Sequence, residues 1–273
     1  MSGKLYVVGT PIGNLGDLSP RAVEVLSSVD FIAAEDTRVT VKLLNHFGIK
    51  KPLVSYFEHN KQEKGEIIIG RIISGEICAL VSDAGMPAIS DPGEELVRLA
   101  HEKSVPVESV PGPSAVITAL AISGMPSGRF CFEGFLSVNK TGRKQHLEEI
   151  KNDTRTLIFY EAPHKLLATL NDMYEVFGER SIAVIKELTK IHETVFKTTF
   201  TGAIAHFNEN PPRGEYVLII EGKPAVAEKV YTIDEAAGIA RKLIENGTAP
   251  TLAAKEAARV SGLKKGDIYK AIL

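Results

Sequence analysis

Residues 79–93 read ALVSDAGMPAISDPG. The first three residues are apolar and predict a buried strand, and the Gly, Pro and Asp residues that follow predict a loop before a helix near Glu94. In open α/β sheets, ligands bind outside the carboxyl ends of the strands, where Gly and Pro let the backbone pass close to a ligand. We expect Asp91 to cap the helix and Pro92 to be its first residue. No helix cap requires residues 83–86, so we interpret them as part of a binding site.

Four other apolar segments in the first half of the chain also predict short strands that end in polar or Gly/Pro-rich loops. Helical patterns follow these loops, so this half consists of strand-helix units in succession. Such alternation is typical of a doubly wound, mainly parallel sheet, in which the loops after the strands gather at one edge. The loops, with the one already quoted, span residues 9–17, 35–38, 56–60, 83–93 and 111–115.

Three of these loops allow two interpretations each. The loop GTPIGNLGD at 9–17 follows neither the GxGxxG nor the GxxxxGK[ST] spacing of phosphate-binding loops. It is either a ligand loop that presents Thr10 and Asn14 or a tight turn. The run EDTR at 35–38 is either an ion-paired start of a helix or a group that faces the ligand cleft. Ser114 either caps the next helix or reaches the ligand.

The pattern changes near GMPSG at residues 124–128, which we interpret as a domain boundary. Further strand-like segments, interrupted by helical patterns, predict a second α/β domain with a mixed sheet. Beyond residue 224 the strand character is lost, and the helices around the turn at 260–263 resemble a helix-turn-helix. The sequence therefore predicts domains over residues 1–123 and 124–224, followed by a helical tail over residues 225–273.

Two groups of basic residues are candidate contacts for phosphate. The run at 140–151 is either a solvated helix face or a phosphate contact, and it contains Lys140, Arg143, Lys144, His146 and Lys151. The helices of the tail carry Arg259, Lys264, Lys265 and Lys270. They form either a small packing module or a contact for nucleic acid.

The composition is that of an ordinary soluble globular protein. The chain has 273 residues, of which 44% are hydrophobic, and a formal net charge of -2, which argues against a protein that coats nucleic acid non-specifically. We expect Cys78 and Cys131 to be buried free thiols, and we expect no structural metal site. The start of the chain lacks the pattern of a signal peptide and no segment is apolar enough to span a membrane, so we expect a cytoplasmic protein.

Several motifs together resemble a known family. They are LYVVGTPIGNLGDLSPRA, AAEDTR, SYFEHN, VSDAGMPAISDPG, VPGPSA, FYEAPH and RGEYVLIIEG, and they span about residues 4 to 222. In order and spacing they are similar to the bacterial methyltransferases that 2'-O-methylate a cytidine in the decoding region of 16S ribosomal RNA. The resemblance implies the tetrapyrrole-methylase fold, an α/β fold in which two domains hold S-adenosylmethionine between them. It also implies a homodimer that acts on the small ribosomal subunit.

Carried over onto the matching motifs, the resemblance implies a set of site residues. Those implied to bind the methyl donor are Asp83, Ala84, Gly85, Met86, Ser114, Ala115, Tyr160, Glu161, Ala162, Gly214 and Glu215. The loop at 9–15, the EDTR turn and residues 56–60 are implied to line the acceptor side. Candidates for the general base are Glu35, Asp36, Glu58 and His59, with an acidic residue of the EDTR turn preferred. Arg38 is a candidate to hold the target phosphate, and this scheme requires no metal.

Two other functions remain open at this point. A methyltransferase of the same fold can act on a tetrapyrrole, although the first loop reads GTPIGN where such relatives carry a GxGPG-like loop. The other alternative is a nucleic-acid-binding regulator led by the C-terminal helices, which would leave the loops of the first 220 or so residues without a purpose. Binding of S-adenosylmethionine separates this regulator from both enzymes.

Overall fold

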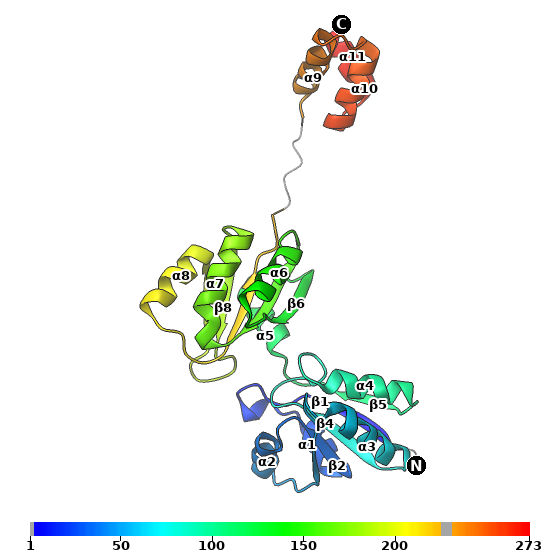
Figure 1. Ribbon diagram of the computed structural model, residues 1–273, viewed down its shortest axis with the longest axis vertical. Helices are drawn as coiled ribbons and strands as arrows, with labels where there is room; N and C mark the ends of the chain where they lie inside the picture. Colours follow the sequence, from blue (N-terminus) through cyan, green and yellow to red (C-terminus); the bar gives the residue numbers. More distant parts are fainter. Residues whose placement is uncertain (1–2, 225–230) are drawn as a thin grey trace. The chain divides into compact units, whose positions relative to one another are not determined.

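The computed structural model describes residues 3–224 and 231–273 (Figure 1). Contacts divide the chain into two compact units, Met1–Lys223 and Pro224–Leu273. The tail expected over residues 225–273 begins with residues 225–230, which lie outside the described residues.

The first sheet has five strands, all parallel as predicted, and their order is β3-β2-β4-β1-β5. The strands are β1 (Lys4–Val8), β2 (Phe31–Ala34), β3 (Leu53–Ser55), β4 (Ile77–Val81) and β5 (Val107–Val110). The helical elements between and after them are η1 (Leu15–Asp17), α1 (Pro20–Ser28), α2 (Thr37–His46), α3 (Lys61–Ile73), α4 (Gly93–Glu102) and α5 (Ala115–Ser123). Apolar side chains of α1 and α2 pack on one face of this sheet, and those of α3 and α4 pack on the other. The sheet is therefore doubly wound.

The start of α4 differs in detail from the expectation. The Asp91 carboxylate does bind the helix start, since its Oδ1 accepts hydrogen bonds from the N–H groups of Gly93 at 2.8 Å and Ala88 at 3.0 Å. Pro92, however, stands just before the helix and is not its first residue. The reason is that the Asp91 side chain closes a tight loop around Ala88, which moves the first helical residue to Gly93.

The second sheet is mixed, with the strand order β6-β7-β10-β8-β9. Its strands are β6 (Phe130–Phe135), β7 (Thr156–Glu161), β8 (Ser181–Lys186), β9 (Thr194–Thr199) and β10 (Tyr216–Ile220), of which β6 and β7 are parallel and the other neighbours antiparallel. One face packs on α6 (Lys140–Ile150), α7 (Pro163–Phe177) and α8 (Phe200–Glu209). The other face packs on α5 through Val116, Ala119 and Leu120. The packing therefore favours a boundary ahead of α5, whereas the sequence predicted one after residue 123.

Most basic side chains of the run at 140–151 pair with acidic side chains. The guanidinium of Arg143 is buried and binds Asp172 at 2.6 Å, and Lys144 pairs with Glu175 at 2.6 Å. His146 contacts Glu133 at 2.9 Å. These pairs favour a structural role for the run over a phosphate contact.

In the second unit, the described residues 231–273 form three helices, α9 (Ile233–Glu245), α10 (Pro250–Ser261) and α11 (Lys265–Ile272). Its buried core consists mainly of alanines, with Ile268 from α11. Gly262 ends α10 in the left-handed conformation with a φ of 71°, which a glycine adopts without strain. Two helices joined by a short turn at Gly262 thus occur where the sequence predicts them.

Neither cysteine of the chain is in a disulfide. Cys78 is fully buried in β4, and its burial raises the pKa of the thiol to about 12. Cys131 is only partly buried, so the expectation of burial holds for Cys78 alone. Among the described helices, none combines the length and the apolar composition that crossing a membrane demands.

Candidate active site

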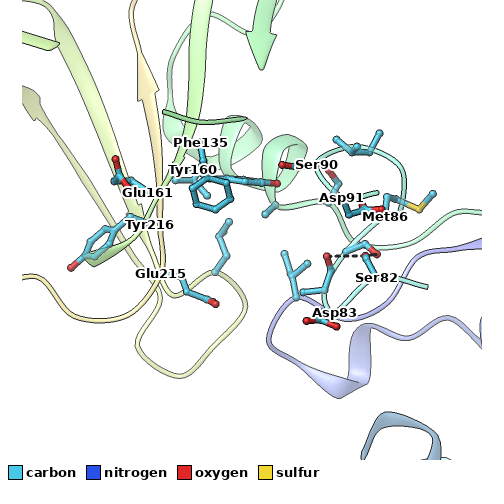
Figure 2. Close-up of a pocket in the computed structure, with 18 of the residues that line it drawn as sticks. Ser82, Asp83, Met86, Ser90, Asp91, Phe135, Tyr160, Glu161, Glu215 and Tyr216 are labelled. Carbon is cyan, nitrogen blue, oxygen red and sulfur yellow. Dashed lines mark hydrogen bonds between the residues drawn. The ribbon is translucent and has the colours of Figure 1, made fainter. Parts of the chain in front are cut away.

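A cavity of about 460 Å³ lies where loops that follow β2, β4 and β5 face the second sheet (Figure 2). We call the side built by the first sheet and its loops the first wall, and the side built by β6, β7, β8, β10 and their loops the second wall. The first wall contributes Ile12, Glu35, Ser82, Asp83, Ala84, Gly85, Met86, Ile89, Ser90, Asp91, Ser114 and Ala115. The second wall contributes Phe135, Tyr160, Glu161, Ala162, Pro163, Ile185, Leu188, Glu215, Tyr216 and Val217.

The cavity brings together most of the residues that were expected to hold the methyl donor. All of them except Gly214 line it. Of the catalytic candidates, Glu35 lines the cavity, whereas Asp36, Arg38, Glu58 and His59 do not. Ser114 precedes α5 without capping it through its side chain, which leaves the hydroxyl available to the cavity.

Backbone contacts hold the first wall together. The N–H of Thr10 donates to the carbonyl of Gly85 at 3.0 Å, and the N–H of Gly85 donates to the carbonyl of Thr10 at 3.1 Å. The Thr10 hydroxyl is buried and donates to the Ser82 carbonyl at 3.3 Å, so it ties two loops together and does not face a ligand. A Cβ on Gly9 would lie 2.6 Å from the Cα of Gly112, so the two backbones cross in contact.

Glu35 and Asp83 form a carboxylate pair at the edge of the first wall. Oδ1 of Asp83 accepts the N–H of Asp36 at 3.0 Å, and Oε2 of Glu35 accepts the N–H of Asp83 at 3.4 Å. Desolvation, and then the negative charge of Asp83, raise the pKa of Glu35 above its ordinary value. Desolvation also raises the pKa of Asp83. A carboxylate with a raised pKa is the better proton acceptor, so Glu35 is suited to the role of general base.

Asp36 is engaged outside the cavity. Its Oδ2 pairs with the Arg38 guanidinium at 2.6 Å, and its Oδ1 accepts the N–H of Arg38 at 2.8 Å, which caps α2. Hydrogen bonds from the side chain and the backbone of Arg38 lower the pKa of Asp36 to about 2. A carboxylate held so firmly in its charged form is a weak base, and this separates Asp36 from Glu35 as a catalytic candidate.

Glu58 and His59, which were expected on the acceptor side, do not line this cavity. Glu58 pairs with Lys61 at 2.7 Å and its side chain is 64% exposed, while the ring of His59 contacts Phe57. Both residues follow β3, which is the edge strand of the sheet. Because β3 is at the opposite end of the sheet from β5, its loop is the one farthest from the β5 loop, and it contributes no residue to the cavity.

A network of charged side chains holds the second wall where β10 begins. The Glu187 carboxylate accepts the N–H of Glu215 at 3.0 Å and the ammonium of Lys190 at 3.1 Å, and Lys190 also binds Oε2 of Glu215 at 2.8 Å. A Cβ on Gly214 would lie 2.6 Å from Oε1 of Glu187, and the φ of Gly214 is 84°. Gly214 thus makes room for the Glu187 carboxylate instead of lining the cavity.

Glu161 is buried on the second wall and is held by neutral donors. Its Oε1 accepts the N–H of Ala162 at 2.8 Å, and its Oε2 accepts the Thr169 hydroxyl at 2.5 Å. These contacts fix the carboxylate beside Tyr160. The Tyr160 ring lies in edge contact with Phe132, at a centroid distance of 4.9 Å.

The sequence did not single out several residues that line the cavity. They include Ser82, Ile89, Ser90, Phe135, Ile185, Leu188, Tyr216 and Val217. Phe135 was within reach of prediction, because an isolated glycine inside a strand, here Gly134, is the usual sign of a bulge. Ser82, Ile89 and Ser90 lie in the loop that the sequence did identify, at 79–93, whereas the remaining residues depend on strand pairing that the sequence does not show.

The charge of the cavity favours a cationic ligand. The residues that line it include the acidic residues Glu35, Asp83, Asp91, Glu161 and Glu215, and no lysine or arginine is among the described residues that line it. A negative cavity with apolar and aromatic surface attracts a positively charged, partly apolar ligand and repels phosphate. No group of three or more His, Cys, Asp or Glu residues with metal-binding geometry occurs in the described part of the chain.

Comparisons with known proteins agree with this architecture. The family model of the Tetrapyrrole (Corrin/Porphyrin) Methylases matches residues 4–203. The ribosomal RNA small subunit methyltransferase I of Xylella fastidiosa is 48% identical over 271 residues, which are 98% of this chain and 98% of that protein. The protein of the same name from Thermotoga maritima is 45% identical over 221 residues, which are 81% of this chain but 99% of its own length.

A solved structure shares the fold. The uroporphyrin-III-C-methyltransferase of Thermus thermophilus has a TM-score of 0.57 and 19% identity, over 81% of this chain and 94% of that chain. The predicted tetrapyrrole-methylase fold is confirmed, and the chain is a methyltransferase. It belongs to the tetrapyrrole methylases and, within them, to the family of the enzymes named ribosomal RNA small subunit methyltransferase I.

Proposed function

We propose that the chain transfers a methyl group from S-adenosylmethionine to the ribose 2'-oxygen of a cytidine in 16S ribosomal RNA, with the small ribosomal subunit as substrate. The observation that carries the proposal is the negative cavity between the two walls, in a chain 48% identical to a ribosomal RNA small subunit methyltransferase. S-Adenosylmethionine carries a positive sulfonium and an ammonium group, and both suit a cavity lined by carboxylates.

The donor is proposed to lie along the cavity, with its polar groups near Asp83, Gly85 and Ser114 and its adenine end near Glu215. Gly85 lines the cavity with a φ of 87°, a conformation that a glycine adopts without strain and that brings the loop backbone close to a ligand. Tyr160 and Ala162 contribute apolar surface from the opposite wall. The residues present therefore fit the donor without a phosphate-binding loop.

When bound, S-adenosylmethionine supplies a methyl group that is already activated for transfer. The protein has to align the 2'-hydroxyl with this group and accept the hydroxyl proton. Glu35 is proposed to take the proton, because its pKa is raised and it lines the cavity. Such a base contributes about 10² to 10⁴ in rate. Arg38, whose side chain is 87% exposed outside the cavity, is proposed to contact a phosphate of the RNA backbone.

The proposal extends to the state of the protein in the cell. We propose a cytoplasmic homodimer, as the resemblance implied. An assembled subunit is the preferred substrate, since the formal net charge of -2 gives little general attraction to naked RNA.

The test is transfer of labelled methyl from S-adenosylmethionine to small ribosomal subunits, to their naked RNA and to a uroporphyrinogen. The expected result is label on the ribose of one cytidine, found by mapping the RNA after nuclease digestion. Label on the tetrapyrrole alone would instead support the alternative acceptor of the fold. A protein that does not bind the donor at all would contradict the assignment of the cavity.

The helices of the second unit are proposed to add contacts to RNA phosphates. Lys264 and Lys265 are exposed at the start of α11, directly after the turn at Gly262. Reversing both charges, Lys264→Glu with Lys265→Glu, is expected to raise the KM for subunits by about 5-fold and to flatten its salt dependence. Donor affinity should stay unchanged. An unaltered KM at every salt concentration would remove these helices from RNA binding.

A further inference from the structure

The strand β6 contains a bulge that turns one aromatic side chain into the cavity. Along the parallel pair of β6 and β7, Phe132 lies opposite Ile158, but Gly134 lies opposite Phe159 and Phe135 opposite Tyr160. Glu133 is therefore one residue more than a regular ladder accommodates. Bulges are rare in parallel pairs and occur next to active sites, where they redirect a side chain.

The extra residue changes the face to which Phe135 belongs. In a regular strand, residues three apart point to opposite faces. Here Phe132 and Phe135 both contact the ring of Tyr160, with centroid distances of 4.9 Å and 5.4 Å. The φ of 65° at Gly134 permits the bulge, and the Glu133 side chain is held by His146 of α6 at 2.9 Å.

The redirected ring of Phe135 packs against another aromatic ring and is otherwise largely exposed. Phe135 is 58% exposed although it lines the cavity, and Tyr160 lies against it. Figure 2 shows Phe135 and Tyr160 together, across the cavity from Asp83 and Met86. A regular strand would have pointed residue 135 to the opposite face of the sheet, where the core cluster with α6 and α7 lies. The bulge thus leaves a large apolar surface uncovered at the place where a ligand binds.

The charge of the cavity restricts what can cover this ring. Phosphates are repelled by the carboxylates of the lining, so an RNA acceptor has to enter as a ribose and base with its phosphates outside. Enzymes that modify nucleotides in this way turn the nucleotide out of its stack and hold the base against an aromatic side chain.

We propose that Phe135 is the stacking platform for the cytosine base of the target nucleotide, and that it thereby places the 2'-oxygen at the methyl group. This inference rests on the proposed function. Stacking on a supported ring needs no charged group, which suits a cavity that already carries negative charge. The ring positions the acceptor, whereas the donor is held between the loops of the first wall and Tyr160, Ala162 and Glu215 of the second.

The test compares Phe135→Leu, which keeps an apolar side chain without a ring, with Phe135→Trp, which keeps a ring. Methylation of small subunits is measured as kcat/KM, and binding of S-adenosylmethionine alone is measured by calorimetry. Phe135→Leu is expected to lower kcat/KM about 10- to 100-fold, the usual value of one stacked base, with donor affinity unchanged within about 2-fold. Phe135→Trp is expected to restore most of the activity.

A matched control is Val138→Ala, which changes an apolar side chain that is 74% exposed near the same loop but does not line the cavity. It should methylate subunits normally. Normal kcat/KM in Phe135→Leu would overturn the inference alone. A parallel loss of donor affinity would also overturn it, because the ring would then pack on the donor. Absence of ribose methylation by the unaltered protein would overturn the proposed function as well.

Discussion

The two walls of the cavity are held in different ways. In the first wall, backbone meets backbone: Thr10 pairs with Gly85, and Gly9 crosses Gly112 in direct contact. In the second wall, side chains hold the structure, as in the contacts of Lys190 with Glu187 and Glu215. The first wall is therefore sensitive to any added atom, whereas the second tolerates changes that keep its contacts.

The carboxylates of the two walls also differ in the groups that hold them. Those of Glu35 and Asp83 accept backbone N–H groups and have raised pKa values. On the second wall, Glu215 is paired with Lys190 and Glu161 with the Thr169 hydroxyl. The difference supports our proposal that proton transfer belongs to the first wall, while the second wall supplies shape and support.

The largest effect is expected for Glu35→Gln. This change keeps the size of the side chain but removes the proton acceptor, so kcat should fall by about 10² to 10⁴. Single-turnover methylation of subunits with saturating donor measures it. Asp36→Asn is the matched control, since Asn also caps helices and this carboxylate lies outside the cavity. It should lose less than about 10-fold. If Asp36→Asn were the slower variant, the assignment of the base would be reversed.

Gly9→Ala should destabilise the first wall through a steric clash alone. The new Cβ would lie 2.6 Å from the Cα of Gly112, so one of two backbones has to move. A loss of about 3 kcal/mol in the free energy of unfolding is expected, measured by urea denaturation with circular dichroism. Gly70→Ala serves as control, because it adds a methyl group in open space on α3 and should stabilise by up to about 1 kcal/mol. Equal unfolding of both variants would show that the loops at Gly9 and Gly112 adjust freely.

Asp83→Asn should weaken donor binding by about 10-fold, because it removes one negative charge from the cavity. It should also change the pH profile. The charge of Asp83 contributes to the raised pKa of Glu35, and Glu35 has to be deprotonated to act. The acid limb of kcat/KM is therefore expected above the ordinary pKa of glutamate in the unaltered protein, and at lower pH in Asp83→Asn. If the acid limb of kcat/KM lies at the same pH in Asp83→Asn, the group that titrates is not Glu35.

The smallest effect is expected from Lys190→Gln on the second wall. The variant releases Oε2 of Glu215 from its ion pair, and exposed pairs of this kind contribute little. Donor affinity should change by no more than about 2- to 4-fold, with kcat unchanged, and Lys190→Arg should behave as the unaltered protein. Calorimetric titration with S-adenosylmethionine measures the effect. A large loss of kcat would mean that the second wall takes part in the chemistry.

The two walls also differ in how far the sequence reveals them. Loops such as 83–86 were predictable, because Gly, Pro and Asp after an apolar strand identify a ligand loop in a parallel sheet. The position of Glu58 and His59 outside the cavity was not predictable, because strand order decides which loop lies near the cavity. The sequence alone does not show that β3 is at the edge of the sheet. The position of Phe135 in the cavity depends on one extra residue in the pairing of β6 with β7, because a shift by one residue exchanges the two faces of a strand.

The alanine core of the three-helix unit has a consequence for how this protein family changes over time. Small side chains such as Ala236, Ala253 and Ala257 bury little apolar area, so a unit of this size is expected to be only marginally stable. Its core cluster shares no residue with the four clusters of the larger unit. The Thermotoga maritima relative, which matches only 81% of this chain over nearly all of its own length, is short by about the size of this unit. Members of this family thus differ by a segment about as long as this unit, and we expect a helical group of such low stability to be gained or lost more readily than either sheet.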